Sequence, residues 1–251
     1  MSFQILSDLH SESNMKDALN AVARLTKKAN ILVVPGDIGS FYKLESMFTL
    51  FKKMLEKFEH VVYVPGNHEY YYPIDASTKR KTPGELFYYF KKGLAERPDL
   101  KNVNVLNRSM ARIGDITFAG CTLWSDPSPL RELPPYVRLD MSINHYGDMH
   151  RRDLRWLHRV SKVDNLAKLV VVTHHAPSKK LLKPSSFVNR YWSLYASNLT
   201  KTSIFKRADV WIFGHTHNNE DVVFKSTRVV SNQLGKSADP CDIDTEQLIQ
   251  I

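Results

Sequence analysis

Residues 31–37 read Ile-Leu-Val-Val-Pro-Gly-Asp, a short apolar run that stops at a turn signal and an acid. An apolar run of this length, rich in β-branched residues and bounded by Pro and Gly, is typical of a buried strand. Similar runs lie at residues 3–6 and 61–64, and apolar residues recur at helical spacing in the two intervening segments, residues 15–28 and 43–58. This β-α-β-α-β order predicts a parallel sheet with right-handed connections.

The rest of the chain alternates in the same way and predicts one α/β domain over residues 1–251. Residues 103–109 and 115–123 are expected to form a β-hairpin with its turn near Gly114. Helical patterns cover residues 148–163 and 187–207, and further strands are expected at residues 169–172, 210–213, 221–224 and 227–231. The last two strands are expected to close a second sheet.

Composition excludes several classes of protein. With 43% hydrophobic and 24% charged residues among 251, the chain can bury a full core, so wholesale disorder is excluded. Cys121 and Cys241 are too few for a disulfide framework or a zinc ribbon and fit a reducing compartment. No apolar run approaches the roughly 18 residues of a membrane span, and the first strand leaves no room for a signal peptide. We therefore expect a cytoplasmic protein with no membrane partner.

Polar side chains follow five of the apolar runs at the point where each run ends. They are Asp8 and His10, Asp37, Asn67 and His68, His174 and His175, and His215 and His217. Because ligands of open α/β sheets bind outside the carboxyl ends of the strands, we expect these side chains to converge. The two-residue spacings of Asp8-x-His10 and His215-x-His217 place both members of each pair on one side of an extended backbone. Gly36, Gly66 and Gly214 are expected to permit sharp turns out of the strands.

Carboxylates, an amide oxygen and imidazoles together form a mixed oxygen and nitrogen donor set. Such a set suits Mn, Fe, Zn, Co or Ni rather than the all-oxygen surroundings that calcium prefers. Each short motif is a weak signal alone. Polar groups gathered at strand ends with nothing to bind them are electrostatically costly, so the combined pattern predicts a divalent metal site.

The ordered motifs resemble those of the calcineurin-like metallophosphoesterase superfamily: Asp8-x-His10, Gly36-Asp37, Gly66-Asn67-His68-Glu69, His174 and Gly214-His215-x-His217. The chain looks most like the small single-domain prokaryotic or phage-type members. The resemblance implies an α/β/β/α fold, in which two mixed β-sheets pack as a sandwich flanked by helices and carry a two-metal site at the strand ends. Gly36-Asp37 is followed by Ile38-Gly39-Ser40 rather than the Asp-Arg-Gly of the Ser/Thr protein phosphatases, which disfavours that branch.

Carried over motif by motif, the resemblance assigns a role to each residue. One divalent ion would be held by Asp8, His10 and His217, and a second by Asn67, His174 and His215, with Asp37 bridging both. His68 would lie just outside the metals as the general acid or as a phosphate-positioning group. In the pair His174-His175 the spacing to the following proline favours His174 as the ligand, with His175 as the alternative.

The resemblance implies hydrolysis of a phosphomonoester or phosphodiester by a hydroxide that bridges two divalent metal ions. A metal-dependent nuclease or nucleotide pyrophosphatase is the nearest alternative, with an anionic nucleotide or oligonucleotide in place of a small phosphate ester. A non-catalytic scaffold of the same fold is a remote alternative, because every expected ligand position is filled. The sequence leaves the oligomeric state open.

Two segments near these motifs are candidates for substrate selection. Residues 124–150 form a long stretch that is expected to act as a lid or insert, with a purely structural excursion as the alternative. Tyr70-Tyr71-Tyr72 could wall the substrate pocket by stacking on a ring, or could pack against the protein itself.

The net charge of +9 arises within residues 151–207, where 13 lysines and arginines face only Asp153 and Asp164. Three of these cations directly follow the His174 motif: Lys179, Lys180 and Lys183. We expect them to border the substrate entrance, where positive charge recruits anions. The alternative is a solvated surface that only aids solubility.

Overall fold

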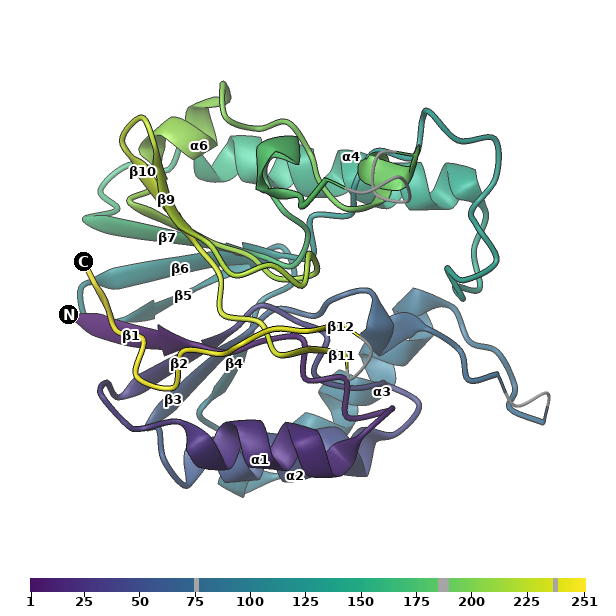
Figure 1. Cartoon of the computed structure of the whole chain (residues 1–251), viewed down its shortest axis with the longest axis horizontal. Helices are drawn as coiled ribbons and strands as arrows, with labels where there is room; N and C mark the ends of the chain where they lie inside the picture. Colours follow the sequence, from purple (N-terminus) through teal and green to yellow (C-terminus); the bar gives the residue numbers. More distant parts are fainter. Residues whose placement is uncertain (75–76, 185–189, 237–238) are drawn as a thin grey trace.

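Two mixed β-sheets pack face to face in the computed structural model, which describes residues 1–74, 77–184, 190–236 and 239–251 (Figure 1). The first sheet has the order β13 (Ile249–Gln250), β1 (Ser2–Ile5), β2 (Ile31–Val34), β3 (His60–Tyr63) and β4 (Val103–Val105). The second has the order β5 (Ser109–Ile113), β6 (Ile116–Cys121), β7 (Lys168–Thr173), β8 (Val210–Ile212), β10 (Thr227–Val230) and β9 (Asp221–Phe224). β11 (Gly235–Lys236) and β12 (Asp239–Pro240) form a separate antiparallel pair.

Helices cover the outer face of each sheet, which confirms the predicted α/β/β/α fold (Figure 1). The first sheet is covered by α1 (Met15–Arg24), α2 (Leu44–Leu55) and α3 (Pro83–Ala95), and the second by α4 (Ile143–Val160) and α6 (Ser203–Arg207). Short 3₁₀ helices are η1 (His68–Tyr70), η2 (Pro98–Leu100), η3 (Lys179–Leu181) and η4 (Trp192–Leu194). Within the described ranges, no helix has the length and apolar character required to cross a membrane.

Strands β1 to β4 run parallel, as the β-α-β-α-β pattern predicts. In the β2–β3 pair, Ile31 lies opposite His60 and Val34 opposite Tyr63. β13 pairs antiparallel with β1, so the two chain ends meet at one end of the sandwich, whereas β11 and β12 lie toward the other end (Figure 1). Strands β9 and β10 close the second sheet as expected.

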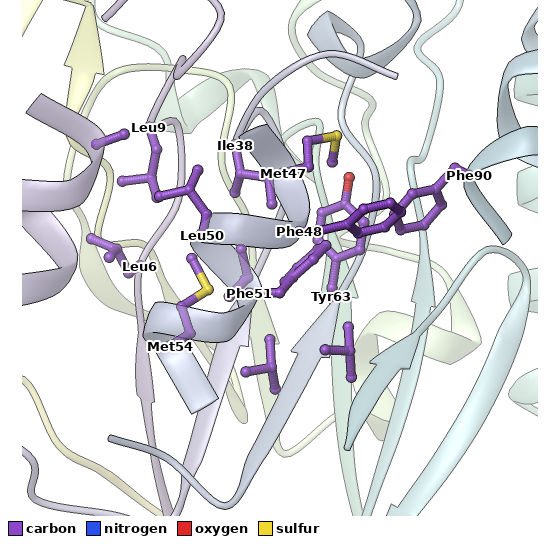
Figure 2. Packing of buried hydrophobic residues seen from close by; sticks show 14 of the residues in the cluster. Leu6, Leu9, Ile38, Met47, Phe48, Leu50, Phe51, Met54, Tyr63 and Phe90 are labelled. Atoms are coloured by element: carbon purple, nitrogen blue, oxygen red, sulfur yellow. The ribbon is translucent and has the colours of Figure 1, made fainter. Parts of the chain in front are cut away.

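Alternate residues of each strand face different layers of the core, because successive side chains point to opposite faces of a sheet. Ile5 and Val33 face the second sheet, whereas Leu6 and Leu32 face the helices. On the helix side, residues of α2 pack over the strands beside Tyr63 and beside Phe90 of α3 (Figure 2). The labelled α2 side chains are Met47, Phe48, Leu50, Phe51 and Met54.

Helix α3 was absent from the sequence prediction although its start carries a clear signal. Thr82 Oγ1 accepts a hydrogen bond from the backbone N–H of Glu85 (3.3 Å), and the Glu85 carboxylate accepts one from the backbone N–H of Thr82 (2.8 Å). This reciprocal capping box precedes a proline at the first helical position. The buried side chains recur every four positions: Leu86, Phe90 and Leu94.

The hairpin prediction was correct at its turn and wrong in its first strand. β5 pairs with β6 across the Gly114 turn, whereas residues 103–105 form β4 and join the first sheet beside β3. Arg108 has a left-handed φ of +53° between β4 and β5. The chain therefore changes direction there and crosses from one sheet to the other.

Two helix predictions also need correction. α4 begins at Ile143 rather than at residue 148, because Ser142 Oγ caps the helix by accepting the backbone N–H of His145 (3.2 Å). Residues 143–150 of the expected lid are therefore helical. In the 187–207 pattern, residues 187–189 lie outside the described residues, and the described part contains short helical stretches separated by irregular chain.

Candidate metal centre

The structure brings the sequence-predicted ligands together where strands β1, β2, β3, β7 and β8 end. The described residues form three clusters of donor atoms there, of which one joins His10 to Glu12 and His68. The other two contain only predicted ligands. Asp8, His10 and His217 make the first, and Asp37, His174 and His215 make the second, with Asn67 beside them. In each three-residue cluster the potential ligand atoms lie within 4.8 Å of one another.

In the first cluster two imidazole nitrogens face each other. His10 Nε2 lies 3.1 Å from His217 Nε2, and the latter lies 3.7 Å from Asp8 Oδ1. His10 Nδ1 lies 3.3 Å from the Glu12 carboxylate and donates its proton there, which leaves a lone pair on Nε2. Asp8 is fully buried and is oriented by the hydroxyl of Ser7, which donates to Oδ2 (2.5 Å).

In the second cluster backbone carbonyls fix the orientation of both rings. His174 Nδ1 donates to the carbonyl of Pro35 (2.8 Å), and His215 Nε2 donates to the carbonyl of Leu194 (3.2 Å). A neutral ring that donates from one nitrogen carries a lone pair on the other. When both rings are neutral, as metal binding requires, His174 Nε2 and His215 Nδ1 direct lone pairs at each other across 3.2 Å.

Two oxygen atoms also lie close to His174 Nε2. His174 Nε2 lies 2.8 Å from Asn67 Oδ1 and 3.3 Å from Asp37 Oδ1. Buried acceptors that face one another without a proton or cation between them are costly. Burial lowers the pKa of His174, but the Asp37 carboxylate outweighs it and raises that pKa to about 9. The cluster therefore attracts positive charge, as a metal site must.

Asp37, a member of the second cluster, also contacts the backbone of His68. Its Oδ1 accepts the backbone N–H of His68 (2.8 Å). Burial opposes ionisation of Asp37, but the rings of His174, His68 and His10 hold its pKa well below the usual value. His10 belongs to the first cluster, so the Asp37 carboxylate interacts electrostatically with both.

The backbone that carries these ligands is left-handed rather than extended. The φ angles are +56° at Asp8, +45° at His10, +52° at Asp37, +69° at His215 and +46° at His217. The prediction that a two-residue pair aims at one centre is correct for Asp8 and His10, which share the first cluster, but wrong for His215 and His217, which lie in different clusters. Its reason, an extended backbone, is wrong for both pairs. Non-glycine residues in this region store strain, which the surrounding structure must balance.

The glycines of the motifs are required mainly because a side chain at these positions would collide with neighbouring atoms. Only Gly36 has a positive φ, +92°, whereas Gly66 and Gly214 have no left-handed backbone that would demand glycine. A Cβ on Gly66 would overlap Asp37 Oδ1, and one on Gly214 would lie 2.7 Å from Asp8 Oδ2. The absence of a side chain lets the ligand carboxylates approach the neighbouring loops.

Glu69, the last residue of the Gly66-Asn67-His68-Glu69 motif, is buried and supports the loops that carry the ligands. From the sequence, no role was assigned to it. Its carboxylate accepts backbone N–H groups from Asp37 (3.1 Å), Ile38 (2.9 Å) and Gly66 (2.8 Å). Burial and the Asp37 charge raise the pKa of Glu69 to about 8. Glu69 thus ties the loop after β2 to the loop after β3.

Three further residues near the clusters were missed by sequence reasoning. Glu12 accepts from Nδ1 of His68 (2.9 Å) as well as from His10, and Lys236 Nζ lies 3.1 Å from His68 Nε2. Burial lowers the pKa of His68 even though Asp37 opposes this shift. Gln233, which is fully buried, accepts the backbone N–H of His217 at 2.8 Å. Of these three residues, only Glu12 had a signal in the sequence, because it follows His10 by two positions.

His175 lies outside both clusters. Its Nδ1 lies 3.2 Å from the carbonyl of Thr122, and its ring is 4.3 Å from that of His215 between centroids. Burial and the neighbouring His174 lower the pKa of His175 to about 3. The geometry therefore favours His174 over His175 as a ligand.

A cavity of about 890 Å³ opens beside the clusters. Tyr71 lines it, whereas Tyr70 is buried and Tyr72 lies against Arg80 (4.2 Å from the ring centroid). Part of the 124–150 segment forms another wall: Pro135, Tyr136, Val137, Arg138 and Tyr146. The backbone N–H of Tyr72 donates to the Arg138 carbonyl (2.9 Å), which holds this wall in place.

The cations on the described cavity wall come from outside the basic segment. They are Arg138 and Lys236. Lys179, which lies 4.7 Å from the Trp192 ring centroid, and Lys180 are exposed and do not line the cavity, and neither does Lys183. The described lining therefore gives no support to the expectation that Lys179, Lys180 and Lys183 border the entrance.

Comparisons with known proteins agree with this geometry. A family model described as calcineurin-like phosphoesterase matches residues 1–219. Uncharacterized protein L509 of Acanthamoeba polyphaga mimivirus is 26% identical over 267 residues, covering 92% of this chain and 90% of the viral protein. The phosphopantetheinyl hydrolase PptH from Mycobacterium tuberculosis has a TM-score of 0.72 at 14% identity, covering 95% of this chain and 90% of that chain. The similarity to PptH shows a shared fold.

Replacement of Gly66 tests whether the loops must pack this closely on Asp37. We expect Gly66→Ala to weaken Mn²⁺ binding about 10- to 100-fold in a calorimetric titration, as losses of ligand support do. Gly84→Ala is the matched control, because its Cβ would have no neighbour within 4 Å. Equal Mn²⁺ affinity in the two variants would contradict the packing argument.

Proposed function

Because the chain belongs to the calcineurin-like phosphoesterase family, whose members depend on metal ions, we propose that it hydrolyses a small phosphate ester with two divalent metal ions at this site. The observation that supports this most directly is the second cluster, where lone pairs of Asp37, Asn67, His174 and His215 face one another. The neighbouring cavity has room for an ester beyond its phosphoryl group.

The donor set fits two borderline divalent ions such as Mn, Fe, Zn, Co or Ni. Asp8, His10 and His217 would hold one ion, and Asn67, His174 and His215 the other, with Asp37 shared between them. When bound, such a pair supplies a nucleophile at neutral pH and neutralises charge on the phosphoryl oxygens. The outer contacts of the rings to Glu12, Pro35 and Leu194 select which nitrogen of each neutral ring is left for coordination.

His68 contributes as a phosphate-positioning group in this proposal. The Nδ1 proton of His68 faces Glu12. Nε2 of His68 accepts a hydrogen bond from Lys236, because an ammonium group can only donate. Nε2 is thus unprotonated in this arrangement. The alternative role, general acid, needs a proton on that atom.

The cavity walls favour a small ester over a nucleic acid. Its described lining includes Arg138 and Lys236, while the 13 cations of residues 151–207 are absent from it. We propose that residues 124–150, through Tyr136 and Arg138, and Tyr71 on the adjoining loop select the group esterified to phosphate. A phosphomonoester or a phosphodiester with one compact ring or chain fits this description.

Asp37→Asn tests the shared carboxylate. We expect kcat/KM for the best substrate in a screen of mono-, di- and cyclic phosphate esters to fall by more than about 100-fold, because loss of a ligand exceeds loss of its support. Asp221→Asn is the control, because Asp221 pairs with Arg228 on β10, away from the cavity lining. Full activity in Asp37→Asn, or in chelator-treated wild-type protein, would refute the proposal.

His68→Ala separates the two roles of His68. We expect similar losses of kcat/KM on nitrophenyl phosphate and on an alkyl phosphate, because positioning matters for both. A general acid is typically worth 10²–10⁴-fold, and nitrophenolate leaves with little need of a proton. A far larger loss on the alkyl ester would therefore assign His68 as the acid.

A further inference from the structure

Lys236 reaches the candidate centre from a part of the chain beyond the family match, which ends at residue 219. The residues just before it are attached to the end of β1. The backbone N–H of Leu234 donates to the Ser7 carbonyl (3.0 Å), and Gln233 forms a bridge with Ser7. Because Gln233 also supports His217, the segment that carries Lys236 is tied directly to the ligands.

The ammonium of Lys236 contacts a neutral group. His68 Nε2, an acceptor, lies 3.1 Å from Lys236 Nζ. An ammonium has three donors, so two remain for other groups. Lys236 also lines the cavity next to Asp37, Asn67 and His217. A cation on the wall of a cavity favours an anionic ligand.

We propose that Lys236 binds an oxygen of the substrate phosphoryl group, a contact that rests on the proposed function. Two successive contacts fix the position of Lys236. Glu12 accepts a hydrogen bond from His68 Nδ1 at 2.9 Å, and Lys236 Nζ donates to the other ring nitrogen, Nε2. The ammonium is thereby held at the edge of the clusters. The ligand class is a phosphoryl group with at least one charged oxygen left free by the metal ions.

Inorganic phosphate binding to the full-length Mn²⁺-loaded protein tests this contact without any hydrolysis. We expect Lys236→Met to weaken phosphate binding about tenfold or more, which is typical for loss of a hydrogen bond to a charged group. Lys236→Arg should retain most of the affinity, because it keeps the charge. Lys180→Met should match wild type, because Lys180 is exposed and lies outside the cavity lining. All variants should keep the wild-type number of bound Mn²⁺ ions.

Phosphate affinity in Lys236→Met equal to that of wild type would overturn the inference. Loss of Mn²⁺ from that variant would also overturn it, because Lys236 would then support the metal ligands instead of contacting phosphate. A different result would contradict the proposed function: wild-type protein that binds Mn²⁺ and phosphate yet hydrolyses no phosphate ester. The two proposals are therefore distinguishable.

Discussion

The convergence of acceptor atoms in the second cluster is the constraint that organises the surrounding loops. When the rings are neutral they donate outward to backbone carbonyls, and His174 Nε2, His215 Nδ1, Asn67 Oδ1 and Asp37 Oδ1 meet with no donor between them. Holding such a cluster requires support on several sides. The Glu69 carboxylate joins two loops through three backbone N–H groups, and glycines admit the carboxylates where any Cβ would collide. The left-handed ligand residues indicate that backbone strain is accepted for the same purpose.

The C-terminal part of the chain completes the centre instead of merely closing the fold. β10 and β9 extend the second sheet, and the chain then returns to β1, where Gln233 fixes the His217 backbone and Lys236 meets His68. The family match ends before these residues. Residues beyond the matched range thus supply a support for His217 and one of the two cavity cations, Lys236, whereas the other, Arg138, lies within that range.

The sequence predicted the parallel strands and the candidate ligands because both leave local signals: short apolar runs, and polar residues directly after them. It predicted the convergence of Asp8 and His10 for the wrong reason, since left-handed φ angles cannot be read from a two-residue spacing. The α3 signal at Thr82–Glu85 was readable and was missed. Glu12, Gln233 and Lys236 act through tertiary contacts, most of them between distant segments, which no periodicity encodes. Charge counting suggested that Lys179, Lys180 and Lys183 border the entrance, but net charge does not say which side chains line a cavity, and none of the three is among the described lining residues.

The central claim is that two metal ions share Asp37, and electron paramagnetic resonance of the Mn²⁺-loaded protein tests it most directly. Ions in a two-metal site lie about 3.5–4 Å apart, close enough to couple magnetically. At two equivalents of Mn²⁺ the account predicts the spectrum of a spin-coupled pair, converted to that of isolated ions by Asp37→Asn. A wild-type spectrum of magnetically isolated Mn²⁺ at saturation would contradict it.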